Sequence, residues 1–364
     1  MAATVLDTLC AQGLPGAPPL PNLDSSEWGE MLKAGRRERV LALVAEVVHE
    51  RGLALSDEVR RELTTGHQAV MQSCLLLERA TIEVGDLFDE QRIEYRVLKG
   101  PAVAHLDYPS PSWRQFGDVD VLVRGASYDA AVRALESRGG HRRSAEIRVG
   151  FDRRFGKGVC VRRSDGIQVD VHRTLASGPF GHTIGLDTLF LGNNRVRLGD
   201  RDIPTLTREC RFIHACVHAV LGDERPRAGV LRDVAQLLLM TDLDVDRVVS
   251  LAHEWRLTSV MATAIATTWG RLHLTPTPIS LWAKHHRGEG FERRALAAYH
   301  GPNRSYARQM IAGIPAIRGA GAKASYVGSL LLVDGAYARR HDGGQLRRVA
   351  RALRSLPRRR GPRS

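Results

Sequence analysis

Lysine is scarce in this sequence, although basic residues are common. The chain has 364 residues, and only five of its 53 Lys and Arg residues are lysines. Arginine is therefore the default base, and a lysine is mildly informative wherever it occurs. The five lysines are Lys33, Lys99, Lys157, Lys284 and Lys323.

Cysteines and long apolar runs are also few. The five cysteines form no Cys-x-x-Cys pair, which argues against a thiolate metal cage or a disulfide framework. We expect reduced core thiols and a cytoplasmic protein. No run reaches about 18 apolar residues, so we expect no transmembrane helix. The first residues include Asp7 and no basic segment, unlike a secretory signal. The hydrophobic fraction of 43% excludes global disorder.

The net charge of +13 is concentrated near residue 364. Residues 339–364 hold ten arginines and one aspartate, a charge of +9, so the other 338 residues carry only +4. A basic stripe on the folded body, which is typical of nucleic-acid-binding domains, is therefore not indicated. We expect an Arg-rich, mostly disordered tail that makes weak electrostatic contact with nucleic acid.

Composition and periodicity divide the chain into five segments. Apolar residues recur at helical spacing before residue 90 and after residue 204. Between these regions, short β-branched runs alternate with helical patterns, and an Asp-Gly turn joins two strands of a hairpin. We predict an α/β (α+β) fold, in which a small mixed sheet is flanked by helices from both ends. The predicted segments are an irregular lead-in (1–26), an N-terminal helical region (27–90), the core (91–203), a C-terminal helical domain (204–338) and the Arg-rich tail (339–364).

Two carboxylates stand on one face of the predicted strand 119–123. Side chains alternate along a strand, so Asp118 and Asp120 share one face while the valines between them face the core. Their Cα atoms would lie about 7 Å apart. Without a cation, repulsion would raise the pKa of at least one carboxyl. A divalent cation removes that cost, and hard oxygen ligands suit Mg²⁺.

The predicted hairpin of strands 159–163 and 167–172 supplies a third acid. Asp170 and His172 share a face, opposite the apolar residues of their strand. If this strand lies beside 119–123, Asp170 completes a three-carboxylate site. Two Mg²⁺ ions held by three aspartates can clamp a phosphate and activate an attacking hydroxyl. His172 either contacts this site or packs beside it.

A Lys-Gly pair stands where a short strand at 95–98 gives way to a short helix at 102–107. Gly100 would let the backbone approach phosphates, and a helix N-terminus attracts anions. Lys99 would neutralise triphosphate charge, or else it is a solvated strand end. Arg114, four residues before Asp118, would act in the same way, or else it pairs with a surface acid.

These motifs together resemble a known family. The stretch VLKGPAVAHLDYPSPSWRQFGDVDVLV, followed by a helix and IQVDVH, resembles the nucleotidyltransferases of the DNA polymerase beta superfamily. Within that superfamily it is most similar to the family described as uncharacterised nucleotidyltransferases. The specific motifs cover about residues 90–180, and residues 231–235 resemble the family's downstream helix that contains an aspartate.

The resemblance implies a reaction and a set of site residues. A nucleoside monophosphate would pass from an NTP to an acceptor hydroxyl or phosphate, with release of pyrophosphate. Two Mg²⁺ ions would be held by Asp118, Asp120 and Asp170, and Asp170 would also deprotonate the acceptor. The implied nucleotide-binding residues are Lys99, Gly100, Arg114 and His172. Most superfamily members carry Gly-Gly or Gly-Ser where this chain has Lys99-Gly100.

Two other functions compete with this one. A non-catalytic protein could keep the fold and use the Arg-rich tail to bind nucleic acid or a protein partner. A toxin–antitoxin component could carry a minimal nucleotidyltransferase that modifies a protein, although such chains are normally shorter. The acceptor, which could be a small molecule, a peptide or RNA, is left open, as are the choice of NTP and the oligomeric state.

Three further patterns receive structural interpretations. Residues 156–158, Gly-Lys-Gly, are predicted to form a turn before the hairpin and not a phosphate loop. His214 and His218 share a helix face, but the zinc-protease pattern needs a Glu after the first His and this chain has Ala215. Asp233 is expected to tie its helix to Arg232 or to the lead-in.

Overall fold

A small mixed sheet lies at the centre of the protein, of which the computed structural model describes residues 2–301 and 304–334. The strand order is β1-β2-β5-β4-β3. β2 runs parallel to β5, and the other neighbouring pairs are antiparallel. The predicted α+β class is therefore confirmed. The strands are β1 (Tyr95–Val97), β2 (Val119–Val123), β3 (His141–Arg142), β4 (Gly158–Arg162) and β5 (Gln168–His172).

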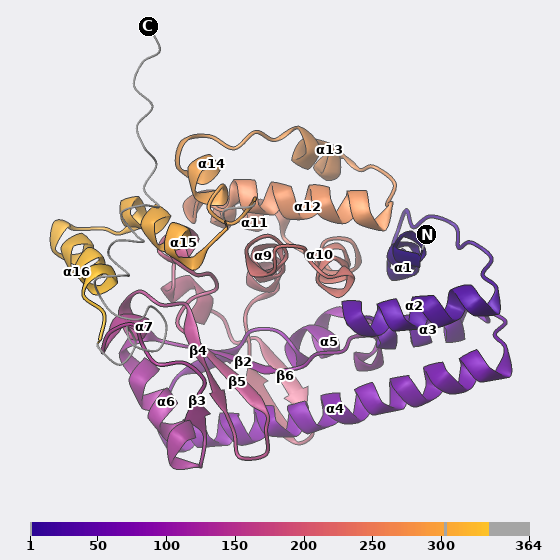
Figure 1. Cartoon of the computed structure of the whole chain (residues 1–364), viewed down its shortest axis with the longest axis horizontal. Coiled ribbons are helices and arrows are strands. Elements are labelled where there is room, and N and C mark those ends of the chain that lie inside the picture. The colour runs from indigo at the N-terminus through magenta and orange to yellow at the C-terminus, as the bar shows by residue number, and fades with distance from the viewer. Residues whose placement is uncertain (1, 302–303, 335–364) are drawn as a thin grey trace, which may run out of the picture.

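One face of this sheet is apolar and is covered by two helices. The valines of β2 and β5 alternate as predicted, and Val121 and Val171 are fully buried. Helices α4 (Asp57–Glu90) and α6 (Tyr128–Ser137) add side chains to the same apolar cluster. Figure 1 shows α4 running beneath the strands. The polar residues that alternate with these valines therefore point to the opposite face of the sheet.

Three helices precede α4, and one of them lies in the predicted lead-in. We expected residues 1–26 to be irregular, but Ala2–Ala11 forms helix α1. Leu6, Leu9 and Cys10 recur at helical spacing and are almost fully buried. Packing therefore stabilises a helix that is too short to be stable in isolation. The other two helices are α2 (Ser25–Glu38) and α3 (Leu41–Arg51).

The chain after the core is mostly helical, as its apolar spacing predicts. Before this helical part, a two-stranded sheet that was not predicted forms from β6 (Arg195–Leu198) and β7 (Arg201–Pro204). The predicted tail, 339–364, lies outside the described residues. The helices are α9 (Arg208–Val217) with a π-helical turn at His218–Gly222, α10 (Ala228–Met240), α11 (Val245–Glu254), α12 (Thr258–Leu272), α13 (Pro278–His285), α14 (Gly290–Leu296), α15 (Tyr306–Gly313) and α16 (Ala320–Leu331). Shorter helices in the core are α5 (Pro101–Asp107), α7 (Phe151–Arg154) and α8 (Gly178–Gly181).

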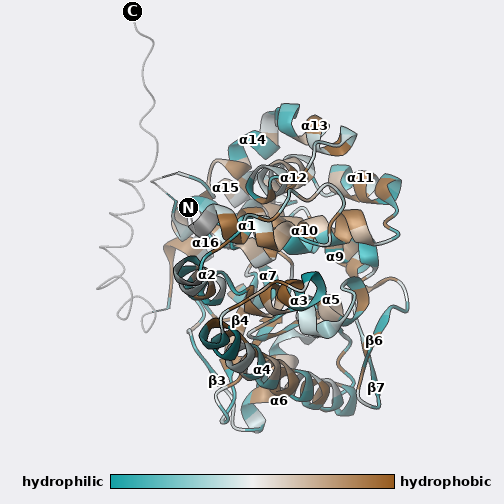
Figure 2. Cartoon of the chain, turned by 90° about the vertical axis from the view of Figure 1, so that its right-hand side faces the viewer, coloured by the Kyte–Doolittle hydropathy of each residue, from teal (hydrophilic) through white to brown (hydrophobic). Residues whose placement is uncertain are grey.

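Helices from distant parts of the sequence share one apolar core. Helix α1 packs against α10 and α12, and Figure 2 shows α1 beside α10. Leu9 of α1, Leu231 of α10 and Ile265 of α12 belong to one buried cluster. In Figure 1, α9 and α10 lie above the sheet, on the side opposite α4. The helices of both ends therefore enclose the polar face of the sheet.

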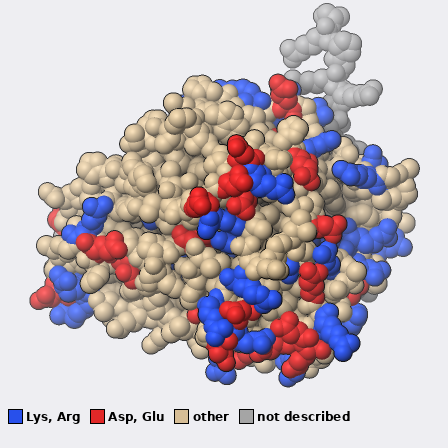
Figure 3. Space-filling model, turned by 180° about the vertical axis from the view of Figure 1, so that it is seen from behind, with Lys and Arg blue, Asp and Glu red and all other residues tan. Residues whose placement is uncertain are grey.

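The surface carries charges of both signs. On the face shown in Figure 3, Lys and Arg side chains are interspersed with Asp and Glu, and they do not gather into one basic area. This distribution agrees with the low net charge of residues 1–338. Among the described residues, no helix combines the length and the apolarity needed to span a bilayer.

Candidate functional site

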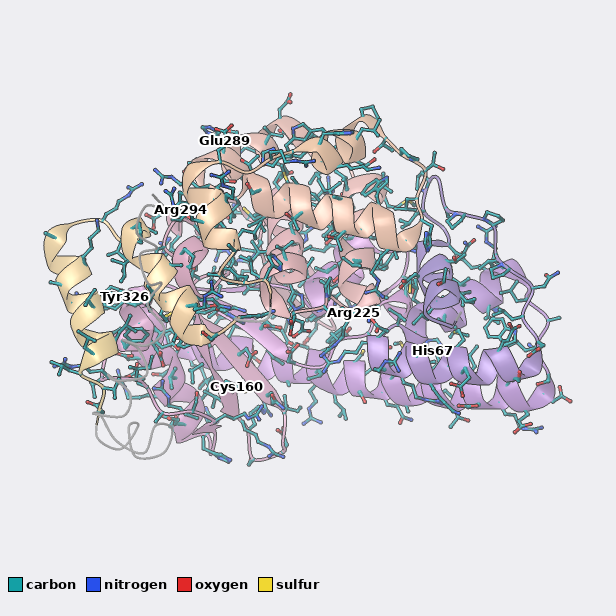
Figure 4. All side chains as sticks on the ribbon, turned by 45° about the horizontal axis from the view of Figure 1, so that its top comes forward. His67, Cys160, Arg225, Glu289, Arg294 and Tyr326 are labelled. Carbon is teal, nitrogen blue, oxygen red and sulfur yellow. The ribbon has the colours of Figure 1, made fainter. Side chains whose placement is uncertain are left out.

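The pairing of β2 with β5 brings two predicted aspartates side by side. In this parallel pair Asp120 lies opposite Asp170, and Leu122 lies opposite His172. The neighbour of Asp170 on the other side is Cys160 of β4, which Figure 4 labels on the sheet below the helices. The condition on which the sequence hypothesis depended, adjacency of the two strands, is therefore met.

Three potential ligand atoms converge on the polar face of the sheet. One atom each from Asp120, Asp170 and His172 lies within 4.8 Å of the others. The His172 Nε2 atom is 2.9 Å from Asp120 Oδ1, and both side chains are buried. Of the two interpretations of His172, the structure supports contact with the site. Asp118 lies outside this group of three.

Lys99 connects Asp118 to the group. Its Nζ atom is 3.0 Å from Asp120 Oδ2 and 3.5 Å from Asp118 Oδ1. The Lys99 side chain is only 20% exposed, so it is not a solvated strand end. The ammonium therefore joins the two carboxylates of the Asp-x-Asp motif.

The charges around Lys99 separate the pKa values of the two aspartates. Burial raises the pKa of Asp118, and the charge of Asp120 raises it further. Burial also acts to raise the pKa of Asp120, but Lys99 and the hydrogen bond from His172 lower it well below its usual value. The expected repulsion between the carboxylates is thus present, and the ammonium of Lys99 offsets it.

Gly100 adopts a backbone conformation that favours glycine. Its φ is +62° and its ψ is −120°, immediately before helix α5. A side chain here would strain the backbone at the junction between β1 and α5. The carbonyl of Gly100 accepts a hydrogen bond of 3.0 Å from Arg114 Nη1.

The structure places Arg114 against a buried acid. Its Nε and Nη2 atoms donate to the two carboxylate oxygens of Asp233, each at 2.8 Å. The hydroxyl of Tyr108 also donates to Asp233, at 2.9 Å. The expectation that Asp233 binds Arg232 or the lead-in is wrong, because the Arg114 fork occupies both of its oxygens. Arg232 itself reaches the lead-in, where the carbonyls of Cys10 and Gln12 accept its hydrogen bonds.

A cavity of about 270 Å³ opens beside the carboxylates. Its floor includes Asp120, Asp170 and His172, and its opposite wall comes from α9 and the π-helical turn. The structure adds three residues that the sequence interpretation left outside the site. They are Lys157, His214 and His218. The available signals were the scarcity of lysine and the four-residue spacing of the histidines.

A smaller pocket of about 70 Å³ adjoins the first. The two pockets share Lys99, Asp118 and His218. The smaller pocket is also lined by Arg114 and other arginines, among them Arg39 and Arg227. Basic side chains therefore surround this second pocket, on the side of Asp118.

The donor set of the site fits a hard divalent cation. Two carboxylates and one imidazole converge within 4.8 Å, and Asp118 provides a further carboxylate at the edge. Carboxylate oxygens are the ligands that Mg²⁺ and Mn²⁺ prefer, whereas an imidazole is more typical of zinc, iron, copper and nickel sites. Lys99 already supplies one positive charge at the same place. The residues present therefore fit the metal that the sequence implied.

The similarity of the chain to one family model shows its family. A family model described as "Uncharacterised nucleotidyltransferase" matches residues 24–269, about two-thirds of the chain. Among solved structures, the antibiotic-resistance factor ANT(2'')-Ia is 15% identical, with a TM-score of 0.34 over 51% of this chain and 91% of that chain. An antigenic nucleotidyltransferase-like protein from Paracoccidioides brasiliensis is 13% identical, with a TM-score of 0.34 over 58% of this chain and 97% of that chain. No curated protein sequence matches this chain.

Proposed function

We propose a specific reaction for this chain, which belongs to the family of uncharacterised nucleotidyltransferases. The reaction is the Mg²⁺-dependent transfer of a nucleoside monophosphate from an NTP to an acceptor hydroxyl or phosphate, with release of pyrophosphate. The observation that carries the proposal is the convergence of Asp120, Asp170 and His172 within 4.8 Å, beside a cavity.

The aspartates have different roles in this reaction. The acceptor oxygen attacks the α-phosphorus, and its proton passes to Asp170. An O–P bond forms as the bond between the α-phosphorus and the bridging oxygen breaks, so pyrophosphate leaves. Asp118, Asp120 and Asp170 would hold Mg²⁺, which supplies the positive charge that offsets the phosphates during an in-line displacement.

The basic residues around the aspartates bind the nucleotide. Lys99 would bind the NTP phosphates, because Mg²⁺ held by Asp118 and Asp120 would supply the positive charge that these carboxylates need. Gly100 has no side chain, so the phosphates can approach the backbone at this junction. Three N–H groups of Arg114 are already hydrogen-bonded, and its remaining N–H groups can face the smaller pocket. His172 orients Asp120 through their 2.9 Å contact.

The proposal extends to location and partners. A cytoplasmic location accords with the cysteine pattern of the sequence. The partners are the NTP and an acceptor of small-molecule, peptide or RNA type, with weak nucleic-acid contact through the Arg-rich tail. Incubation with Mg²⁺ and each α-labelled NTP, followed by addition of a lysate of the native host, would identify both the donor and the acceptor fraction.

The proposal is tested by three aspartate variants, of which two should lose NTP binding and the third should lose mainly the transfer step. Asp118→Asn and Asp120→Asn should lose Mg²⁺-dependent NTP binding, because both remove a carboxylate on the nucleotide side. Asp170→Asn should keep much of the NTP binding but lose at least about 10²-fold in transfer, the low end for loss of a general base. Calorimetric titration of NTP with and without Mg²⁺ measures the first effect.

The control for this test is a distant aspartate. Asp187→Asn changes a carboxylate whose side chain is 96% exposed and should alter neither binding nor transfer. Wild-type protein that binds no NTP in the presence of Mg²⁺ would contradict the proposal and favour a non-catalytic protein. Label found on a protein of the lysate would favour the toxin-type acceptor.

A further inference from the structure

One lysine in the cavity is not used by the reaction as described so far. Lys157 directly precedes β4, where Gly158 pairs with His172 of β5. Its side chain lines the cavity together with Asp170. It forms no ion pair within 4.0 Å with any described acid. Burial lowers the pKa of Lys157, while the charges of Asp120 and Asp170 act in the opposite direction. Its ammonium is therefore free to bind a ligand.

Two imidazoles face Lys157 from the opposite wall. His214 is only 5% exposed, and neither His214 nor His218 forms a hydrogen bond through its ring with another described residue. Burial, reinforced by the charge of Lys99, lowers the pKa of His214 to about 3 and that of His218 well below its usual value. Both rings are thus neutral at pH 7, and each has one N–H to donate.

The shape of the helix directs these rings to the cavity. Helix α9 carries His214 and continues at His218 as a π-helical turn, a local widening that is frequent at functional sites. The two ring centroids are 6.5 Å apart. The ammonium of Lys157, at the start of β4, and the two histidine rings, at the end of α9, therefore border the same cavity.

The charges of this wall favour an anion. If metal ions offset the aspartates and Lys99 binds the phosphates, as proposed above, Lys157 would remain as a cation in the cavity beside Asp170. The acid at the cavity edge, Asp223, already lies 3.6 Å from Arg227. The ammonium of Lys157 would repel a cationic acceptor and attract an anionic one.

We propose that Lys157, His214 and His218 form a subsite for an anionic group of the acceptor, a phosphate monoester or a carboxylate. This inference rests on the proposed nucleotidyl transfer, and it names the acceptor class. Lys157 precedes β4, and strands β2 and β5 separate it from β1, which ends just before Lys99, whereas His218 also lines the smaller pocket. In this proposal the triphosphate binds at Lys99 and the arginines of the smaller pocket. A volume of about 270 Å³ is below the usual range for a drug-sized ligand, so it admits only the reacting end of a larger acceptor.

The test uses the full chain loaded with Mg²⁺ and a non-hydrolysable NTP analogue. Inorganic phosphate is titrated in one arm and acetate in the other, which separates the two anion sources. The readout is the His214 C2–H proton signal in NMR, assigned by its loss in His214→Gln. Phosphate or acetate should shift this signal saturably, and Lys157→Ala should weaken that binding at least about 10-fold. Lys157→Arg should keep part of it.

The control variant is Lys284→Ala, which removes an exposed lysine of α13 and should bind the anion as the wild type does. Failure of wild-type protein to bind the analogue would overturn the proposed function together with this inference. Normal analogue binding with no saturable anion effect, or with the same effect in Lys157→Ala, would overturn the subsite alone. Weaker analogue binding by Lys157→Ala would assign Lys157 to the triphosphate and also overturn the subsite.

Discussion

Lys99 supplies the positive charge that the two carboxylates of the Asp-x-Asp motif share. Burial by itself would lower the pKa of Lys99, but the carboxylates of Asp120 and Asp118 raise it above its usual value. The lysine is therefore firmly charged where two acids meet. In the proposed reaction, Mg²⁺ held by the carboxylates would leave the same ammonium available to the phosphates.

Replacement of Lys99 should affect both NTP binding and the thermal stability of the protein without NTP. Lys99→Ala should weaken NTP binding by about 1.5–3 kcal/mol, the range for a hydrogen bond to a charged group. Lys99→Arg should restore only part of this, because a planar fork does not replace a point charge. In the absence of NTP, Mg²⁺ should raise the Tm of Lys99→Ala more than that of the wild type, since the variant leaves two buried acids without their cation.

Calorimetry and thermal unfolding measure these two effects. The matched control is Lys33→Ala, whose side chain is 70% exposed and pairs with Glu30 on the surface. Equal NTP affinity in Lys99→Ala and wild type would show that Lys99 serves only the carboxylates.

At the scale of the element, α9 and its π-helical turn form the wall that faces the carboxylates. Their histidines are kept neutral by burial, which makes the stability of this wall sensitive to acid. The folded pKa of His214 is lowered to about 3, against 6.5 for an unperturbed histidine. Between these two values the unfolded chain binds a proton that the folded chain does not.

The free energy of unfolding should therefore fall as the solution is acidified. The contribution of His214 is complete above about pH 6.5 and is lost as the pH falls toward 3, with a slope of about 1.4 kcal/mol per pH unit for one proton. His214→Gln should flatten this dependence between pH 6.5 and 4.5. Denaturant unfolding at several pH values checks the slope.

A histidine at the surface serves as the control for the acid effect. His253→Gln replaces an exposed residue at the end of α11 and should leave the slope as in the wild type. If the free energy of unfolding had the same pH dependence in His214→Gln and wild type, His214 would bind a proton as readily in the folded protein as in the unfolded chain.

At the scale of the whole molecule, one apolar core joins helices that are far apart in sequence. Arg232 of α10 donates to the carbonyls of Cys10 and Gln12, and Arg271 of α12 pairs with Asp7 of α1 at 2.7 Å. Helix α1 therefore holds the N-terminal and C-terminal helices together above the sheet.

Truncation of a core residue in α1 should destabilise the whole molecule. Leu9→Ala should lower the free energy of unfolding by about 2–5 kcal/mol, the range for a buried leucine. Unfolding should remain a single transition, because the cluster is shared by both groups of helices. Tryptophan fluorescence and circular dichroism during denaturant unfolding should give the same midpoint.

The matched control is Leu76→Ala, since that side chain on α4 is 60% exposed and should change stability little. Two separate transitions in Leu9→Ala, with only one of them shifted, would contradict a common core.

Local patterns in the sequence were enough to predict which acids share the polar face of the sheet. Alternation placed Asp118 and Asp120 on the polar face of β2 and Asp170 with His172 on the polar face of β5, and the structure has Asp120, Asp170 and His172 together. The α+β class followed in the same way, because strand and helix periods differ and are both visible over a few residues. Helix α1 was missed, since a short apolar repeat beside a Pro- and Gly-rich stretch carries little local signal.

Tertiary structure alone decided which further residues lie near the carboxylates. Residues 156–158 do precede the hairpin, but the register between β4 and β5 also brings Lys157 to the cavity. Arg114 meets Asp233, 119 residues away, and His214 faces the carboxylates only because α9 packs over the sheet. The alternation of a strand is set by neighbouring residues, so the sequence by itself determined which side chains share a face. Contacts between distant segments depend on how all the elements pack together, and only the folded chain determined them.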